Sequence, residues 1–143
     1  MPLRDMSLRE KSAWITVVTV VLSFGGYFGP ILAGWVDWRG HMSVFLLAHS
    51  VMALVVLQAG LNFWATRTTP KDARAPRDER EAAILARSHT LGYYVLLVSV
   101  LALFLPAHLG HPKSDLLNFM LLDVVVAVLT VAIAQIVMFR RGR

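Results

Sequence analysis

The sequence predicts an all-α integral membrane protein, a four-helix bundle with both termini in the cytoplasm. Hydrophobic residues make up 57% of its 143 residues and charged residues only 16%, whereas soluble proteins average about 45–50% and about a quarter. The charges are clustered, which leaves four long apolar runs between them. Lys and Arg are concentrated on one side of these runs. These three observations together predict the fold and its orientation.

Each apolar run has the length of a transmembrane helix, because about 20 residues cross a hydrocarbon core of roughly 30 Å. Only helices and closed barrels satisfy their backbone groups in lipid, and no segment alternates with the period of a strand. We therefore expect a single membrane domain, residues 1–143, with a cytoplasmic loop at 65–90. Its spans are predicted at about 13–35, 43–64, 91–107 and 116–139.

The first span contains a capping box and a row of small residues. The stretch from Ser7 to Glu10 has the capping-box pattern, so the helix is expected to begin before the apolar run. Gly25 and Gly29 form a G-x-x-x-G motif that Ala33 extends, a pattern that lets helices approach closely. Pro30 is expected to kink the helix. We predict that the small-residue face packs either within the bundle or against another protein.

Spans two and four each carry an ionisable side chain, which is costly in a bilayer and therefore a functional candidate. Counted from the outer end, His49 and Asp123 lie at about the same depth, roughly 9–10 Å, and Tyr27 of span one is near that level. They could form a polar site for a proton, a cation or a substrate group. Alternatively, they could simply join helices by a hydrogen bond, or not touch. Three amides are expected to join helices: Gln58, Asn62 and Gln135.

The loop before span three holds the densest charge. Pro70 and Pro76 predict an irregular connector, and the acidic residues that follow are typical of a first helical turn. The residues concerned are Asp78, Glu79, Arg80 and Glu81. They form either a solvated start of the third helix or a docking site for a cytoplasmic partner.

The distribution of positive charge fixes the expected orientation. Twelve of the fourteen Lys and Arg residues lie in the two tails or the 65–90 loop, and only Arg39 and Lys113 lie on the other side. The positive-inside rule makes the richer side cytoplasmic, where these side chains are expected to meet anionic lipid headgroups. Basic flanks of a membrane protein also account for the net charge of +5, and no nucleic-acid motif is present, so we expect no nucleic-acid partner.

Three histidines on the outer side are a weak metal candidate. His108 and His111 are three residues apart, and His41 lies on the same side. Imidazoles of this kind bind Zn²⁺ or Cu²⁺, but Pro106 and Pro112 argue against a regular helix that would align them. We expect neither a metal nor another cofactor.

Three short motifs carry a resemblance to a family: REKSAWI at 9–15, RDERE at 77–81 and GYY at 92–94. In these motifs and in its four-span architecture the chain resembles an uncharacterised group of small bacterial membrane proteins. The resemblance implies a location in the bacterial inner membrane. It implies no activity.

The motifs of common enzymes are missing from the sequence. There is no cysteine, and no nucleophile elbow, zinc-protease helix or phosphate loop. We therefore expect a non-enzymatic protein of structural, regulatory or accessory type that associates with itself or with another membrane protein. The alternative is a small proton-coupled transporter or channel that uses the polar cluster around Asp123 and His49.

Overall fold

The computed structural model describes residues 7–69 and 79–141. These residues form five helices, which are α1 (Leu8–Leu32), α2 (His41–Thr68), α3 (Glu79–Ala102), α4 (Phe104–His108) and α5 (Lys113–Arg141). With α3 and α4 taken as one span, four helices are long and apolar enough to cross a membrane. The all-α, four-span expectation is confirmed.

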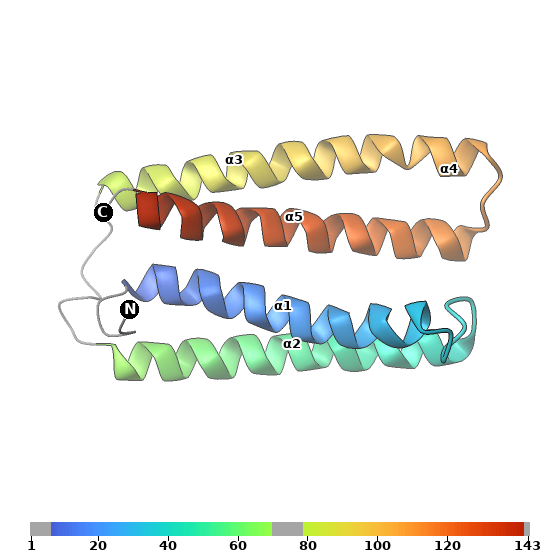
Figure 1. Ribbon diagram of the computed structural model, residues 1–143, viewed down its shortest axis with the longest axis horizontal. Coiled ribbons are helices and arrows are strands. Elements are labelled where there is room, and N and C mark those ends of the chain that lie inside the picture. Colours follow the sequence, from blue (N-terminus) through green and yellow to red (C-terminus); the bar gives the residue numbers. More distant parts are fainter. Residues whose placement is uncertain (1–6, 70–78, 142–143) are drawn as a thin grey trace.

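The helices pack in the order α2, α1, α5, α3 (Figure 1). Extensive interfaces join α1 to α2, α1 to α5 and α3 to α5. Helices α2 and α3 are the outermost members, and they share no extensive interface in the described part of the chain. The beginning of α1 and the end of α5 lie at the same end of the bundle (Figure 1). The central helices therefore bring the polar side chains of α1 and α5 together.

The first helix begins where the capping box predicts. The Ser7 side chain caps α1 and accepts a hydrogen bond from the backbone N–H of Glu10 at 3.2 Å. The helix continues without interruption through Pro30 to Leu32. Thus it starts five residues before the predicted run and contains the whole motif at 9–15.

Two glycines end the helices at the opposite end of the bundle. Gly34 follows α1 with φ of 75°, and Gly110 follows α4 with φ of 80°, a region that L-residues rarely adopt. In both places the next residue donates a hydrogen bond five residues back, from Trp35 to Pro30 and from His111 to Pro106. This is the Schellman arrangement, which satisfies carbonyls left over at a helix end.

The break between α3 and α4 follows from Pro106. Proline has no N–H to donate and its ring clashes with the carbonyl four residues earlier, which belongs to Ala102, the last residue of α3. Leu103 separates the two helices. The third span is thereby longer than the predicted 91–107 and runs from Glu79 to His108.

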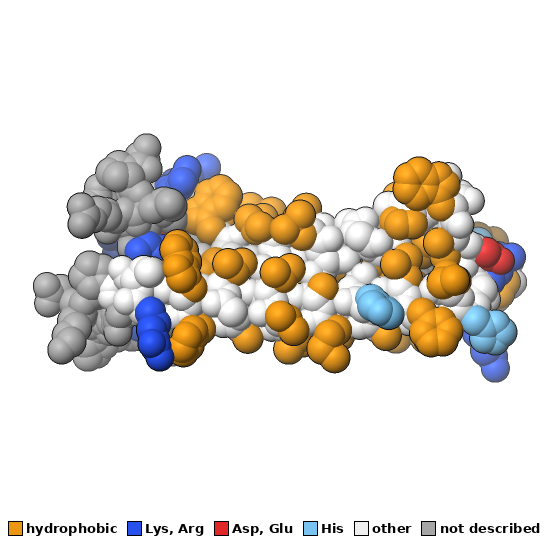
Figure 2. Space-filling model, turned by 90° about the horizontal axis from the view of Figure 1, so that it is seen from below, with side chains coloured by type: hydrophobic (Ala, Val, Ile, Leu, Met, Phe, Trp, Pro, Cys, Tyr) orange, Lys and Arg blue, Asp and Glu red, His pale blue; other side chains and the backbone are white. Residues whose placement is uncertain are grey.

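The core lies where α1, α2 and α5 meet. Its buried residues are Val20, Phe24, Tyr27 and Val125, and leucines of α2 and α5 pack against them. On the face seen in Figure 2, apolar side chains cover the middle of the molecule, and charged side chains lie toward its two ends. This apolar band is what a lipid-facing surface requires.

Candidate functional site

Polar side chains of α1 and α2 form a ladder at the end of the bundle that holds the start of α1. Ser12 Oγ donates to Asn62 Oδ1 at 2.9 Å, and Gln58 Nε2 donates to Thr16 Oγ1 at 2.8 Å. Thr19 Oγ1 also donates to the Gln58 carbonyl oxygen. The prediction that these two amides join helices is confirmed, and interhelical hydrogen bonds of this kind hold membrane helices in register.

The amide of Gln135 joins the other hairpin in the same way. Its Nε2 donates to Ser88 Oγ at 3.2 Å, from α5 to α3. Ser88 is fully buried at this interface. The helix-joining prediction for Gln135 is confirmed as well.

A second polar group lies between α1 and α5. The Tyr27 hydroxyl donates to Asn118 Oδ1 at 2.5 Å, and both residues are buried. Ser23 Oγ and one carboxylate oxygen of Asp123 are also buried, without a hydrogen-bond partner among the described residues. Ser23 precedes Tyr27 by four residues and Asp123 follows Asn118 by five. Because α1 and α5 run antiparallel, both lie about 6–8 Å further along from the Tyr27–Asn118 bond, at a similar level.

The structure does not bring His49 into this group. Its ring Nδ1 lies 2.7 Å from the carbonyl oxygen of Phe45 in the same helix, and the side chain is exposed. No hydrogen bond joins His49 to Tyr27 or Asp123 in the described part of the chain. Depth along the spans was predicted from residue counting, but rotation about the α2 axis turns this side chain away from α5.

At the predicted outer end, an ion pair fixes the α1–α2 loop to α5. Arg39 donates from Nε and Nη2 to the two oxygens of Asp115, at 2.9 and 2.7 Å, and Asp115 is only 1% exposed. The hydrogen bonds and the charge of Asp115 raise the pKa of Arg39 above its usual value. The loop is therefore held by a permanent charge pair of the strong, two-pronged kind.

The outer histidines do not assemble into a metal site within the described residues, where no three His, Asp or Glu side chains are grouped to hold an ion. His111 Nδ1 instead lies 3.5 Å from Asp115 Oδ2, and its ring meets Phe119 edge-on. His41 begins α2, and His108 ends α4.

Three consecutive residues of α1 contact three different segments at the other end of the bundle. Arg9 forms an ion pair with Glu81 of α3, and Glu10 lies 3.7 Å from Arg140 of α5. Lys11 Nζ donates to Thr69 Oγ1, just after α2, at 3.2 Å. Two of the motifs behind the family resemblance, at 9–15 and 77–81, thus contact each other.

This contact changes the picture of the charged stretch before span three. Glu81 is used inside the protein, whereas Glu79 and Arg80 are exposed in the first turn of α3. Asp78 lies outside the described residues. Only part of the predicted docking stretch is therefore seen to be available to a partner.

The small-residue face of α1 is uncovered. A side chain built on Gly25 or Gly29 would meet nothing within 4 Å, and Ala33 is exposed. Tyr27 and Phe24 of the same helix are buried on the opposite side. Of the two predicted uses of this face, packing within the bundle is therefore wrong for the described chain.

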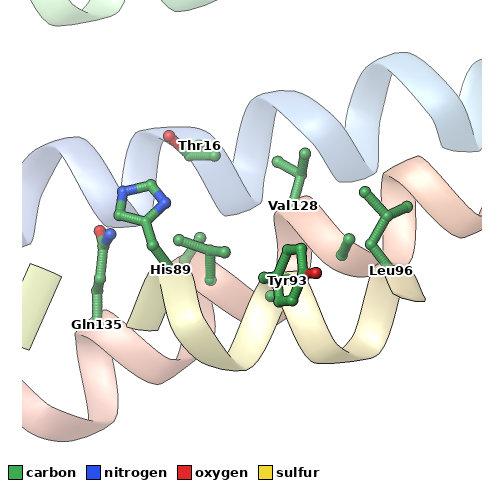
Figure 3. A pocket seen from close by; sticks show the side chains of 10 residues that line it. Thr16, His89, Tyr93, Leu96, Val128 and Gln135 are labelled. Atoms are coloured by element: carbon green, nitrogen blue, oxygen red, sulfur yellow. The ribbon is translucent and has the colours of Figure 1, made fainter. Parts of the chain in front are cut away.

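A cavity of about 450 Å³ lies between α1, α3 and α5, and the sequence did not point to it. Figure 3 shows His89 and Gln135 at one end, near Thr16, with Tyr93 and Leu96 further along. Its remaining lining is apolar, so it could hold an amphipathic molecule with its polar end beside His89. The available signal was the spacing of residues 89, 93 and 96, which places them on one helix face.

Comparisons with protein-family models, with curated proteins and with solved structures give no match to this chain. The fold therefore defines the class of protein, a four-span integral membrane protein. The resemblance to the uncharacterised bacterial group stays a prediction.

Proposed function

We propose that the chain is a non-enzymatic accessory or structural protein of the bacterial inner membrane that works by associating with a second copy of itself. The open order of its helices supports this proposal most directly. Helices α2 and α3 do not close on each other, so one protomer has an unpaired face on each side. Its polar side chains within the spans mainly join one helix to the next.

The uncovered small residues of α1 are the interface we propose for this association. Gly25 and Gly29 are open on their outer side, and small residues four apart allow the close backbone approach that drives helix association in lipid. We further propose that the end carrying Arg9 and Arg140 faces the cytoplasm, since most of the positive charge is there.

Gly29→Leu is expected to weaken self-association about tenfold or more, a loss of at least ~1.4 kcal/mol, because the added side chain keeps two α1 helices apart. The matched control is Gly60→Leu, since Gly60 of α2 is equally open. The dimer fraction would be measured by single-molecule photobleaching in bilayers at several protein densities. A wild-type protein that stays monomeric at every density, or equal loss in both variants, would contradict the proposal.

One observation favours a second candidate, a proton-coupled transporter. A buried carboxylate oxygen of Asp123 and the buried hydroxyl of Ser23 lack partners among the described residues at a similar level of two packed helices. Ionisable groups inside a bilayer commonly mark proton or ion pathways. This candidate rests on Asp123 and Ser23, without His49.

Proteoliposomes containing a pH-sensitive dye separate the two candidates. Under the accessory proposal we expect wild-type protein and Asp123→Asn to show the same proton flux as empty liposomes, and the same dimer fraction. Flux in the wild type that falls at least about tenfold in Asp123→Asn, but persists in the surface control Glu79→Gln, would establish the transporter instead. Asparagine keeps the shape of the side chain and removes its charge.

A further inference from the structure

The arginines in the described part of the chain fall into two groups. Arg9, Arg39 and Arg140 form ion pairs, and Arg67 lies over the ring of Phe63. The others make no hydrogen bond, ion pair or ring contact with described residues. These are Arg80, Arg87 and Arg141.

All three unpaired arginines line one groove between α3 and α5. The groove has a volume of about 410 Å³, and its other lining residues are Ala83, Ile84 and Met138. Residues 80, 83, 84 and 87 fall on one face of α3 because they follow helical spacing. The lining contains no acidic side chain. Three guanidiniums thus surround an apolar floor with no counter-charge among its residues.

The same face of α3 continues as an apolar strip away from the charges. Leu91, Tyr94 and Val98 follow Arg87 at spacings of four, three and four, and they are 45%, 58% and 65% exposed. They lie in the part of the third span that is apolar enough for the membrane interior. A molecule with an anionic head and a hydrocarbon tail would fit both parts of this surface.

We propose that this groove binds the phosphate of an anionic glycerophospholipid, with an acyl chain along the apolar strip of α3. Guanidinium groups bind phosphate oxygens in pairs, and basic pockets at the ends of membrane helices hold anionic headgroups. The apolar floor and strip select a lipid over a soluble phosphate. The proposal requires that the helices span a bilayer and is independent of self-association through α1.

The test is native mass spectrometry of the full-length protein, released from detergent and titrated with phosphatidylglycerol or phosphatidylcholine. We expect the wild type to retain phosphatidylglycerol preferentially, and Arg80→Gln and Arg87→Gln each to weaken this binding about five-fold. Arg80→Gln/Arg87→Gln/Arg141→Gln should abolish the preference. Arg67→Gln removes one charge outside the groove and should leave the preference unchanged.

Several results would overturn the proposal. These are equal retention of the two lipids by the wild type, an unchanged preference in the single variants, or an equal loss in Arg67→Gln. Displacement of the lipid by glycerol phosphate at matched concentration would show that the groove takes a soluble phosphate instead. The single variants are informative even if the triple variant does not fold, because the exposed side chains of Arg80 and Arg87 have no described partner. A failed dimer measurement would leave these lipid results unaffected.

Discussion

Gly92→Leu is expected to lower the free energy of unfolding by about 1–3 kcal/mol, because it forces α3 away from α5. Gly92 is buried, and a Cβ placed on it would collide with Cγ2 of Val131 and press on the carbonyl oxygen of Ala127. Relief requires a shift of the helices, since close-packed interiors do not yield locally. The measurement is thermal unfolding of the purified protein in a mild detergent, followed by circular dichroism.

The matched control for this prediction is again Gly60→Leu. Both variants add the same side chain to a membrane helix, but Gly60 of α2 has open space around it. The control should stay within about 0.5 kcal/mol of the wild type. Equal stability of both variants would mean that α3 and α5 do not pack as closely as described here. The GYY motif at 92–94 would then need another explanation.

Glu81→Arg is expected to lower stability by roughly 1–2 kcal/mol, because the pair with Arg9 is lost and two guanidiniums are placed together. The side chains of Arg9 and Glu81 are 27% and 21% exposed, so they are only partly screened by water. Arg9→Glu/Glu81→Arg restores opposite charges and should recover most of the loss. The same unfolding measurement in detergent, at low and high salt, provides the comparison.

Glu79→Arg is the matched control for the charge reversal. It makes the same change two residues earlier in α3, at an exposed position. We expect little effect from it, and a smaller dependence on salt. If the double variant is no more stable than Glu81→Arg alone, the ion pair does not connect α1 to α3.

Some of the site could be predicted because it depends on features local to one helix. The capping box at Ser7 and the helix-joining roles of Gln58, Asn62 and Gln135 were all predicted. A polar side chain inside a lipid-exposed sequence has few alternatives to pairing with a neighbouring helix. For such groups the need for a partner is visible in the sequence, although the partner itself is not.

Other predictions failed because they depended on helix rotation and on which helices are neighbours. Equal depth suggested that His49 and Asp123 could meet, yet His49 bonds to its own helix on an exposed face. Similarly, the small residues of α1 were compatible with packing inside the bundle, but they lie on its open side. Residue counting gives position along a helix axis and carries no information about the neighbouring helix.

By itself the sequence determined that this is a four-span, all-α membrane protein, because the length and polarity of a segment decide whether it can cross lipid. The positions of caps and of several polar contacts followed from short-range patterns in the same way. Only the tertiary structure decided the neighbour order α2, α1, α5, α3, and with it the pairing of Arg9 with Glu81 and the grouping of three unpaired arginines in one groove. Neighbour order depends on side-chain packing between distant segments, and hydrophobicity along the chain does not specify it.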